Sequence, residues 1–515
     1  MKVTTRPTRF RRLAAGAIAV ALVAAACGGD DDDDDASGDT TAEGTTAEGT
    51  TAEGTTADTA TEGTTEGTAA PTTQPPVETV FGGGEASGGE AVVRWYVGLG
   101  TGAQPEQLAA QRDVVEDFNE SHEGEIQLEV EIVDNEIAFD NLSTQIAGGN
   151  APDIIGPIGI RGSNAFAGQF LNLEPLVEST GYDLSGFDQE QVEFWREETG
   201  ELTALPFGVF PAVMYYNKEL FDEADLEYPP TAYGEPYADG DPWDMDKVAE
   251  LAKILTVDAN GNDATSPDFD PENVVQWGFH HQFNDDARAV GTFFGSGSFV
   301  ADDGTTAQIP ENWLASWQWY VDLIASGAAP NDSQVNSDVL AQTNAFSTGN
   351  VAMAFTHLWY TCCVRDEDGN GLEFWDMAVV PEYQGEATSK LHADTFRILE
   401  STENPEAAFE VLTYLLDEAA PVLLDTYGGL PARADLREPF FASQDELFPQ
   451  GVTWDAALAG LDRPDVPSHE ANMPNFDEAE AAIDSFESRL TTEPNLDVAA
   501  AAEELRVELD AIFKQ

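Results

Sequence analysis

The chain has 515 residues, of which 96 are Asp or Glu and 22 are Lys or Arg, so its formal net charge is −74. A protein this acidic does not bind DNA or RNA by neutralising their phosphates. Hydrophobic residues make up 42% of the chain and include ten Trp and 28 Phe, which is enough apolar surface for a large folded core. The length predicts two or three domain-sized units.

The N-terminus has the anatomy of a secretory signal. Basic residues precede an apolar run at 13–26, which is too short to span a bilayer. The run ends in Leu-Val-Ala-Ala-Ala-Cys at 22–27, and this pattern resembles a bacterial lipobox. We therefore expect residues 1–26 to be a lipoprotein signal peptide and Cys27 to carry the lipid. The alternative is an ordinary secretory signal followed by an incidental cysteine.

Residues 27–89 have the composition of a tether. They contain six consecutive Asp at 30–35 and three copies of Thr-Thr-Ala-Glu-Gly between residues 40 and 54, and Phe81 is their only aromatic residue. Such a segment buries too little apolar surface to offset the entropy cost of ordering it. We expect a disordered, acidic, self-repelling spacer between the lipid and the folded body.

The folded body begins with strands that alternate with helices. A β-branched and aromatic run at 91–97 predicts a buried first strand, and a helical pattern follows through Phe118. A second strand at 126–133 precedes a helix at 138–147, and a turn then leads into a third buried strand at 154–155. This order predicts an α/β fold with a mostly parallel sheet, whose ligands bind beyond the carboxyl ends of the strands.

The loop after the first strand is rich in glycine. Residues 98–103 match the G-x-G-x-x-A spacing of a dinucleotide-binding turn. The acidic residue that would contact the ribose is missing at the end of a second strand, so we expect no NAD and no other cofactor. The loop has two interpretations. It is either a simple turn, or its backbone N–H groups near Gly100 approach a neutral, oxygen-rich ligand.

Four motifs follow one another in a fixed order. They are FN at 118–119 with TQIAGGNAPDI at 144–154, LPF at 205–207 with YNKELF at 216–221, FSTGNVAM at 346–353 with Trp359, and GGLPAR at 428–433. Behind a lipobox and a tether, this set resembles the extracellular solute-binding proteins of ABC importers, in the carbohydrate-type family that includes maltose-binding protein. The chain departs from the family pattern in an insertion at 232–242.

The resemblance implies a two-lobed periplasmic-binding-protein-like fold, in which hinge strands join two lobes of mostly parallel sheet flanked by helices. Lobe one would comprise residues 90–207 and 384–428, and lobe two residues 208–383 and 429–515, with one crossing at 205–216. The resemblance also implies a small solute, expected to be a mono- or oligosaccharide, and an ABC permease as partner. We expect a monomer, lipid-anchored on the extracellular or periplasmic side of the cell membrane.

A sugar site needs aromatic rings for the apolar faces of the sugar and a few polar groups for its hydroxyls. The resemblance implies a stacking tryptophan at Trp359, and strand alternation would place His357 on the same face. The further candidates are Trp95 and Tyr96, of which one is expected to face the core and the other the ligand, Gly100, Phe210 in the hinge, Phe283, and Asp394 in the loop after Lys390. Each of these has a core or surface position as its alternative.

By contrast, Trp313, Trp317 and Tyr320 have helical spacing and predict a core stripe.

Cys362 and Cys363 are adjacent. They are interpreted as two small buried thiols or as a vicinal disulfide, and an oxidising compartment favours the disulfide.

The sequence predicts no metal site. The segment 366–377 begins like a calcium loop but ends in Met377 where the loop needs a bidentate Glu, and the segment 258–263 is incomplete in a similar way. Both are interpreted as solvated acidic turns, with structural calcium as the alternative. The pair His280 and His281 lacks a third ligand at metal spacing.

The expected function is binding without catalysis. No nucleophile motif, zinc-protease motif or P-loop occurs in the sequence. One alternative is a receptor for an anionic solute such as glycerol phosphate, which would need basic residues clustered at the site. The other is a surface glycosidase that uses two of the many carboxylates.

Overall fold

The computed structural model describes residues 79–82, 91–135, 137–187, 189–196, 200–284, 286–341, 344–365, 370–493 and 495–515. The predicted signal peptide, Cys27 and nearly all of the predicted tether lie outside the described residues, and so do residues 366–369 of the first calcium-like segment. Within the described ranges, no helix is both long enough and apolar enough to cross a membrane.

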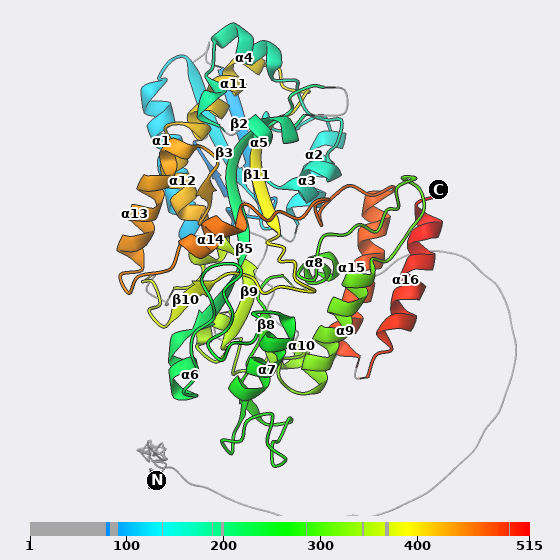
Figure 1. The fold of residues 1–515 in the computed structure, drawn as a ribbon. Coiled ribbons are helices and arrows are strands. Elements are labelled where there is room, and N and C mark those ends of the chain that lie inside the picture. Colours follow the sequence, from blue (N-terminus) through cyan, green and yellow to red (C-terminus); the bar gives the residue numbers. More distant parts are fainter. Residues whose placement is uncertain are drawn as a thin grey trace, which may run out of the picture. The chain divides into compact units, whose positions relative to one another are not determined.

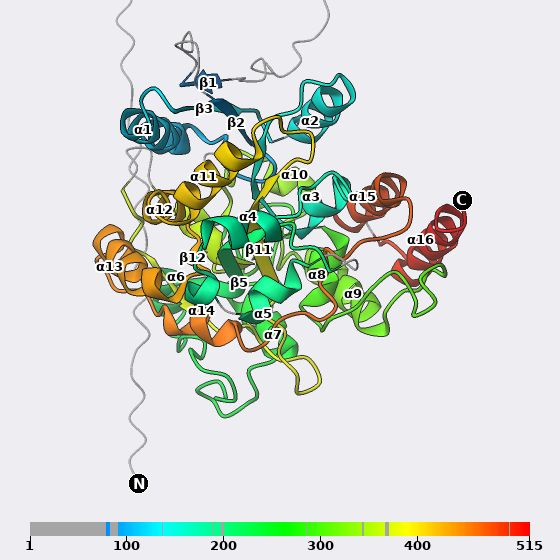
Figure 2. The same ribbon diagram turned by 90° about the horizontal axis from the view of Figure 1, so that it is seen from above.

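The first three strands of the body form the predicted parallel arrangement. Strand β2 (Ala91–Val97) lies between β3 (Ile126–Ile132) and β4 (Ile154–Ile158) and is parallel to both. Helix α1 (Pro105–Ser121) packs on the face that carries Trp95, and α2 (Ala138–Ala147) packs on the face that carries Tyr96. Figures 1 and 2 show the two helices on opposite sides of these strands. The predicted α/β class is confirmed, but the prediction of a mostly parallel sheet is wrong, because most strand pairings of the large sheet are antiparallel.

The large sheet has the order β1-β3-β2-β4-β11-β5-β9-β8, and β10 and β12 also pair with β5. Its remaining strands are β1 (Thr79–Phe81), β5 (Leu205–Asn217), β8 (His280–His281), β9 (Met353–His357), β10 (Trp375–Ala378), β11 (Leu391–Ile398) and β12 (Leu430–Pro431). A separate pair is formed by β6 (Val257–Asp258) and β7 (Val274–Gln276).

Strand β5 joins the two parts of the large sheet. All of its 13 residues are buried. Its first half is antiparallel to β11 and β12, and its second half is antiparallel to β9 and β10. The segment for which the resemblance implied a crossing is therefore one continuous strand. In its middle, Phe210 pairs with His392 of β11, and Ala212 pairs with His357 of β9.

Helices surround the sheet. They are α3 (Ile160–Ala165), α4 (Glu174–Thr180), α5 (Gln189–Phe194), α6 (Lys218–Glu223), α7 (Met245–Leu255), α8 (Ala287–Thr292), α9 (Glu311–Ala325), α10 (Asp332–Val335), α11 (Pro405–Leu416), α12 (Ala420–Tyr427), α13 (Arg437–Leu447), α14 (Asp455–Gly460), α15 (Phe476–Thr492) and α16 (Val498–Ile512). Short 3₁₀ turns are η1 (Leu184–Gly186), η2 (Phe346–Thr348), η3 (Leu358–Cys362) and η4 (Ala434–Leu436).

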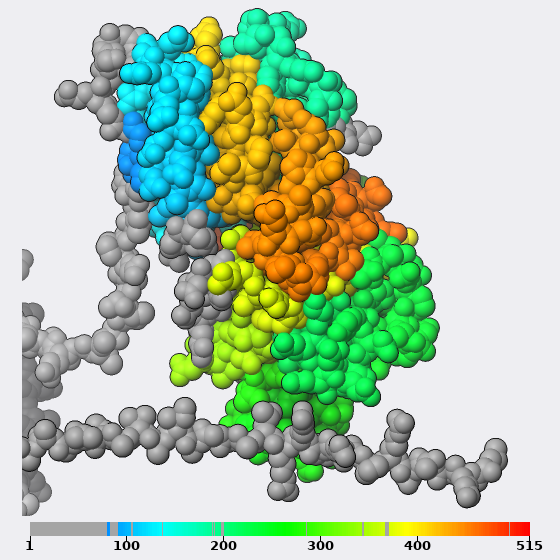
Figure 3. Space-filling view, turned by 90° about the vertical axis from the view of Figure 1, so that its left-hand side faces the viewer, coloured from blue at the N-terminus to red at the C-terminus, as the bar shows by residue number. Residues whose placement is uncertain are grey.

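Two contacts show how distant segments build the cores. The late helices α11 and α12 pack beside α1, where Tyr414 donates a hydrogen bond to the carbonyl of Val114 (3.1 Å), and Figure 3 shows these surfaces side by side. On α9, Trp313, Trp317 and Tyr320 are all buried against α8 and the C-terminal helices. The predicted core stripe is confirmed.

Candidate functional site

An exposed pair of aromatic rings marks the candidate site. Phe283 and Trp359 stack with ring centroids 6.2 Å apart and planes inclined by 28°. Phe283 is 55% exposed, whereas Trp359 is partly buried. Tyr360 packs against Phe283 in a T-shaped arrangement, with centroids 6.0 Å apart. Two large rings thus share one accessible apolar surface.

The backbone at Phe283 is strained. Its φ is +54°, a left-handed value that costs free energy for a bulky side chain and persists only where the surroundings impose it. Both neighbours are fixed: the N–H of Gln282 donates to the carbonyl of Phe355 (3.0 Å), and Asn284 is buried and accepts a hydrogen bond from Lys390 (2.7 Å). An exposed ring held by its neighbours in a strained conformation is typical of a functional position.

His357 lies at the end of β9 and is fully buried. Its Nδ1 is 3.1 Å from the amide nitrogen of Asn284, so Nδ1 accepts and Nε2 carries the proton. Burial, followed by nearby His392 and Lys390, holds the pKa of His357 well below its usual range, so the ring is neutral near pH 7. The ring lies 5.9 Å from that of Trp359. The predicted neighbourhood of His357 and Trp359 is therefore present. It does not arise from strand alternation as predicted, because Trp359 belongs to the 3₁₀ turn η3 and not to a strand.

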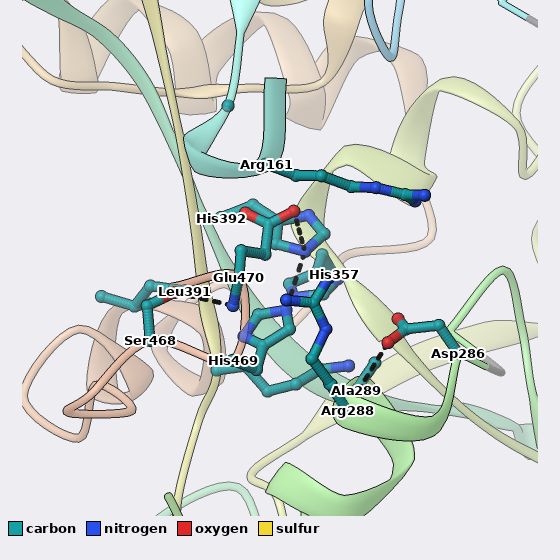
Figure 4. Close-up of polar contacts among 12 residues, drawn as sticks. Arg161, Asp286, Arg288, Ala289, His357, Leu391, His392, Ser468, His469 and Glu470 are labelled. Carbon is teal, nitrogen blue, oxygen red and sulfur yellow. Dashed lines mark hydrogen bonds and ion pairs between the residues drawn. The ribbon is translucent and has the colours of Figure 1, made fainter. Parts of the chain in front are cut away.

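Three further residues, none of them named from the sequence, complete the cluster. His392 stacks on His357 with centroids 3.7 Å apart, and its Nε2 is 3.2 Å from Nε2 of His469. His392 Nδ1 accepts a hydrogen bond from the indole of Trp359 (3.3 Å). The carboxylate of Glu470 faces these rings, 4.0 Å from His392 Nε2 (Figure 4). Burial lowers the pKa of His392 to about 4, so this contact is not an ion pair at neutral pH.

Asp394 lies inside β11, so its predicted position in a loop is wrong. The antiparallel pairing with β5 extends the strand over residues that were interpreted as a connection. Burial, aided by the charge of Glu470, raises the pKa of Asp394 to about 7. Near neutral pH this carboxyl can donate as well as accept a hydrogen bond, which suits a hydroxyl partner.

The basic residues near the cluster already have acceptors. Arg288 of α8 pairs with Glu480 of α15, and Arg161 of α3 reaches the same carboxylate (3.1 Å). Lys390 donates to the side-chain oxygen of Asn284 (2.7 Å) and lies over the ring of Phe293. Positive charge is therefore present beside the cluster. Glu480 engages part of it, while Nη1 of Arg288 is buried without a hydrogen-bond partner among the described residues.

Three predicted ligand residues lie in the core. Trp95 and Tyr96 are both fully buried, and they donate to the carbonyls of Gly156 (2.6 Å) and Ala138 (2.7 Å). Neither ring faces an open surface, because β2 is central and is covered by helices on both sides. Phe210 is 3% exposed and packs in the middle of β5.

Gly100 is exposed in its loop, with a φ of +126° and nothing within 4 Å of the place where a Cβ would stand. Its neighbours have packing reasons to be glycine. A Cβ on Gly98 would lie 2.0 Å from the carbonyl oxygen of Val133, and one on Gly102 would lie 2.1 Å from the side chain of Val97. The loop is at least a tight turn, and its contact with ligand stays a prediction.

The structure has no bond between Cys362 and Cys363, in agreement with the alternative of two thiols, and the vicinal disulfide stays a prediction. Cys362 and Cys363 both carry thiols. Cys362 ends η3, and Cys363 continues the helical backbone with φ −113° and ψ −4°. A 3₁₀ turn points successive side chains about 120° apart, a backbone geometry that does not favour a bond between adjacent cysteines.

Other predicted features lie apart from the cluster. The Asp258 carboxylate accepts hydrogen bonds from the backbone of Asn260, Asn262 and Asp270, as expected for an acidic turn. The inserted segment 232–242 lines a surface hollow together with Trp243, and a second hollow lies between α12 and α13. Neither hollow includes a residue of the ring and histidine cluster.

Comparison with known proteins identifies the family. The sequence pattern of bacterial extracellular solute-binding proteins matches residues 102–420. The chain belongs to this family. The family predicted from the sequence motifs is thereby confirmed.

Among curated relatives, a putative binding protein of Brucella abortus is 25% identical over 302 residues, which are 57% of this chain and 65% of that protein. The chain thus spans less than two thirds of the length of this relative.

Solved structures of solute-binding proteins share the two-lobed fold. An ABC substrate-binding protein from Listeria monocytogenes in complex with cycloalternan is 19% identical, with a TM-score of 0.64 over 82% of this chain and 98% of that one. The maltose/maltodextrin-binding domain MalE from Bdellovibrio bacteriovorus, bound to maltotriose, is 16% identical, with a TM-score of 0.61 over 82% and 100%. At these identities the likeness concerns the fold.

Proposed function

We propose that this solute-binding protein captures a mono- or oligosaccharide on the stacked rings of Phe283 and Trp359. The observation that carries the proposal is an exposed phenylalanine, held at a positive φ against a tryptophan. Sugar rings present apolar C–H faces that pack on aromatic planes, and such packing needs rings that are accessible before the ligand arrives. Sugars bound to the structural neighbours named above support the same class of solute.

Two carboxyl groups on the His392 side of the cluster suit hydroxyl partners. Asp394 has a pKa of about 7 and can donate or accept, and Glu470 offers a carboxylate with little exposure. The nearby Arg288 and Arg161 already contact Glu480. A neutral, hydroxyl-rich solute therefore suits the carboxyl groups of Asp394 and Glu470, whereas an anionic solute would be repelled by them and would depend on Nη1 of Arg288, a buried donor without a hydrogen-bond partner among the described residues.

Capture works by a change in conformational population and makes no covalent bond. His392 and Asp394 belong to predicted lobe one, whereas Phe283, Trp359 and Glu470 belong to predicted lobe two. Contacts between the two predicted lobes, such as the hydrogen bond from Asn164 Nδ2 in lobe one to the carbonyl of Glu470 in lobe two (2.8 Å), favour a closed arrangement. A solute that touches residues of both lobes would stabilise that arrangement further.

Delivery to the membrane is part of the proposal. Cys27 would carry a lipid, the acidic tether would hold the body away from the bilayer, and an ABC permease would accept the solute. Replacing Cys27 with Ser should move the protein from the membrane fraction into the soluble fraction of producing cells. Retention of Cys27→Ser in the membrane fraction would contradict the lipid anchor.

A thermal-shift screen over sugars, polyols and phosphorylated compounds tests the solute class, because a ligand that binds the folded state raises its apparent stability. We expect stabilisation by one or more neutral saccharides. Stabilisation by phosphorylated compounds alone would instead assign an anionic solute. Release of smaller sugars during incubation would indicate a glycosidase and would contradict a binding function.

A further inference from the structure

The histidine cluster has the spacing of a metal site. One ligating atom each from His392, His469 and Glu470 lie within 4.8 Å of one another. The two Nε2 atoms are 3.2 Å apart. Two imidazole nitrogens that bind one tetrahedral zinc ion at about 2.0–2.1 Å are separated by about 3.3 Å, so these two rings already stand at ligand spacing (Figure 4).

We propose that His392, His469 and Glu470 bind one zinc ion and leave its fourth position open. Two imidazoles and one carboxylate are a donor set that favours zinc over magnesium or calcium, because the latter prefer oxygen ligands alone. The zinc site shares Glu470 with the surface proposed for saccharide capture, but the proposal does not depend on that capture.

Asp465 fixes the orientation of His469. The Nδ1 of His469 is 2.6 Å from Oδ2 of Asp465, and Asp465 is itself fixed by the backbone N–H of Leu391 (2.9 Å). The Nδ1 proton therefore points at the carboxylate, and the lone pair of Nε2 points at His392. A carboxylate behind a histidine is the usual arrangement that fixes the ring of a zinc ligand and raises its basicity.

One carboxylate oxygen of Glu470 lacks a partner. Its Oε2 is buried and has no hydrogen-bond partner among the described residues. A hydrogen bond from His392 to His469 would account for the 3.2 Å contact between the rings, but it leaves this oxygen unsatisfied, which is costly for a buried polar group. A divalent cation between the three side chains would contact Oε1, which lies 4.0 Å from His392 Nε2, and would give this little-exposed carboxylate a partner of opposite charge.

Metal binding would act on the ring pair. With zinc on Nε2, the proton of His392 must lie on Nδ1, the atom that now accepts a hydrogen bond from the indole of Trp359 (3.3 Å). Two N–H groups would then face each other, so Trp359 must give up this contact. The zinc site and the position of Trp359 are therefore coupled.

The test is a zinc titration of the full chain against a chromophoric chelator. Excess Mg²⁺ is included because the protein has 96 acidic residues, whose oxygen atoms would otherwise bind zinc weakly. Co²⁺ in place of zinc reports the coordination geometry by its visible absorption. The variants are Glu470→Gln, His469→Ala and Asp465→Asn, with His122→Ala, at the end of α1, as the matched control.

We expect one zinc per chain, at least tenfold weaker binding in each of Glu470→Gln and His469→Ala, and about 10–100-fold weaker binding in Asp465→Asn. His122→Ala should bind as the wild type does. No binding above the Mg²⁺ background, or equal binding by Glu470→Gln and the wild type, would overturn the proposal. Glu470→Gln keeps the side-chain volume, so it remains decisive if His469→Ala fails to fold.

One further variant tests the coupling. Trp359→Phe removes the indole N–H but keeps a ring, so zinc should bind severalfold more tightly. Unchanged zinc affinity in Trp359→Phe would show that the metal site and the ring pair are independent.

Discussion

The ring of Phe283 lies over that of Trp359 at a centroid distance of 6.2 Å, and Phe283 keeps this place at a φ of +54°. Glycine adopts such a φ without strain, whereas for phenylalanine it costs about 1–2 kcal/mol. We expect Phe283→Gly to leave the free energy of unfolding within about 1 kcal/mol of the wild type, because relief of strain offsets the loss of ring contacts. Urea unfolding measures this. A loss of about 3 kcal/mol or more, on the scale of a core residue, would show that Phe283 serves stability instead of binding.

A buried ion pair allows a matched comparison with an exposed one. The side chains of Arg288 and Glu480 are 6% and 10% exposed, whereas those of Arg506 and Glu503 are 32% and 62% exposed. Glu480→Gln leaves a buried guanidinium without its carboxylate and should cost about 3–5 kcal/mol, whereas Glu503→Gln should cost less than about 1 kcal/mol. Chemical denaturation of both variants gives the two values. Equal losses would contradict the burial of this pair.

His280 makes stability sensitive to acid. Burial lowers the pKa of His280 to about 4, so the folded protein keeps it neutral while the unfolded chain protonates it near its ordinary value. The stabilising contribution is present above pH 6.5 and is lost as the pH falls through 4.

We expect the wild type to lose up to about 3 kcal/mol more than His280→Leu between pH 7 and pH 4, because the pKa of the imidazole is lower in the folded protein than in the unfolded chain. Leucine suits the buried position and cannot titrate. Parallel unfolding curves at both pH values would reveal the difference, and identical losses in the two proteins would assign the acid sensitivity to other groups.

The adjacent cysteines give a chemical prediction. Because Cys362 and Cys363 carry thiols, denaturation in iodoacetamide without reductant should alkylate both, and mass spectrometry of the peptide that contains them should find two additions. A peptide with no addition and a mass lower by two hydrogens would restore the vicinal disulfide.

Elements whose pattern is local were predictable from the sequence. The β-branched run at 91–97 and the apolar runs at 126–133 and 154–155 specify buried strands by themselves, and the structure has β2, β3 and β4 there. The stripe of Trp313, Trp317 and Tyr320 similarly reports one helix face. Asp394 was misplaced because β11 forms by pairing with β5, which lies far earlier in the chain.

The site was predictable only in part. The family motifs indicate Trp359, and Phe283 is one of the further ligand candidates from the sequence. His392 meets His469 and Glu470 only after folding, since it lies far from both of them along the chain. The sequence contains one local signal of this cluster: Asp465 and His469 are four positions apart, and Glu470 follows the histidine directly. In the structure, Asp465 fixes the ring of His469. Trp95 and Tyr96 were misjudged because the sequence did not show that helices cover both faces of β2.

Isothermal titration with the saccharide that gives the largest thermal shift tests the central claim most directly. The comparison is between the wild type, Phe283→Ala and Phe194→Ala, because Phe194 on α5 is 56% exposed and Phe283 is 55% exposed. Loss of a stacking ring should weaken affinity at least about tenfold, equivalent to about 1.4 kcal/mol, in Phe283→Ala, while Phe194→Ala should bind as the wild type does. Equal affinity in all three proteins would contradict saccharide capture on the Phe283 and Trp359 rings.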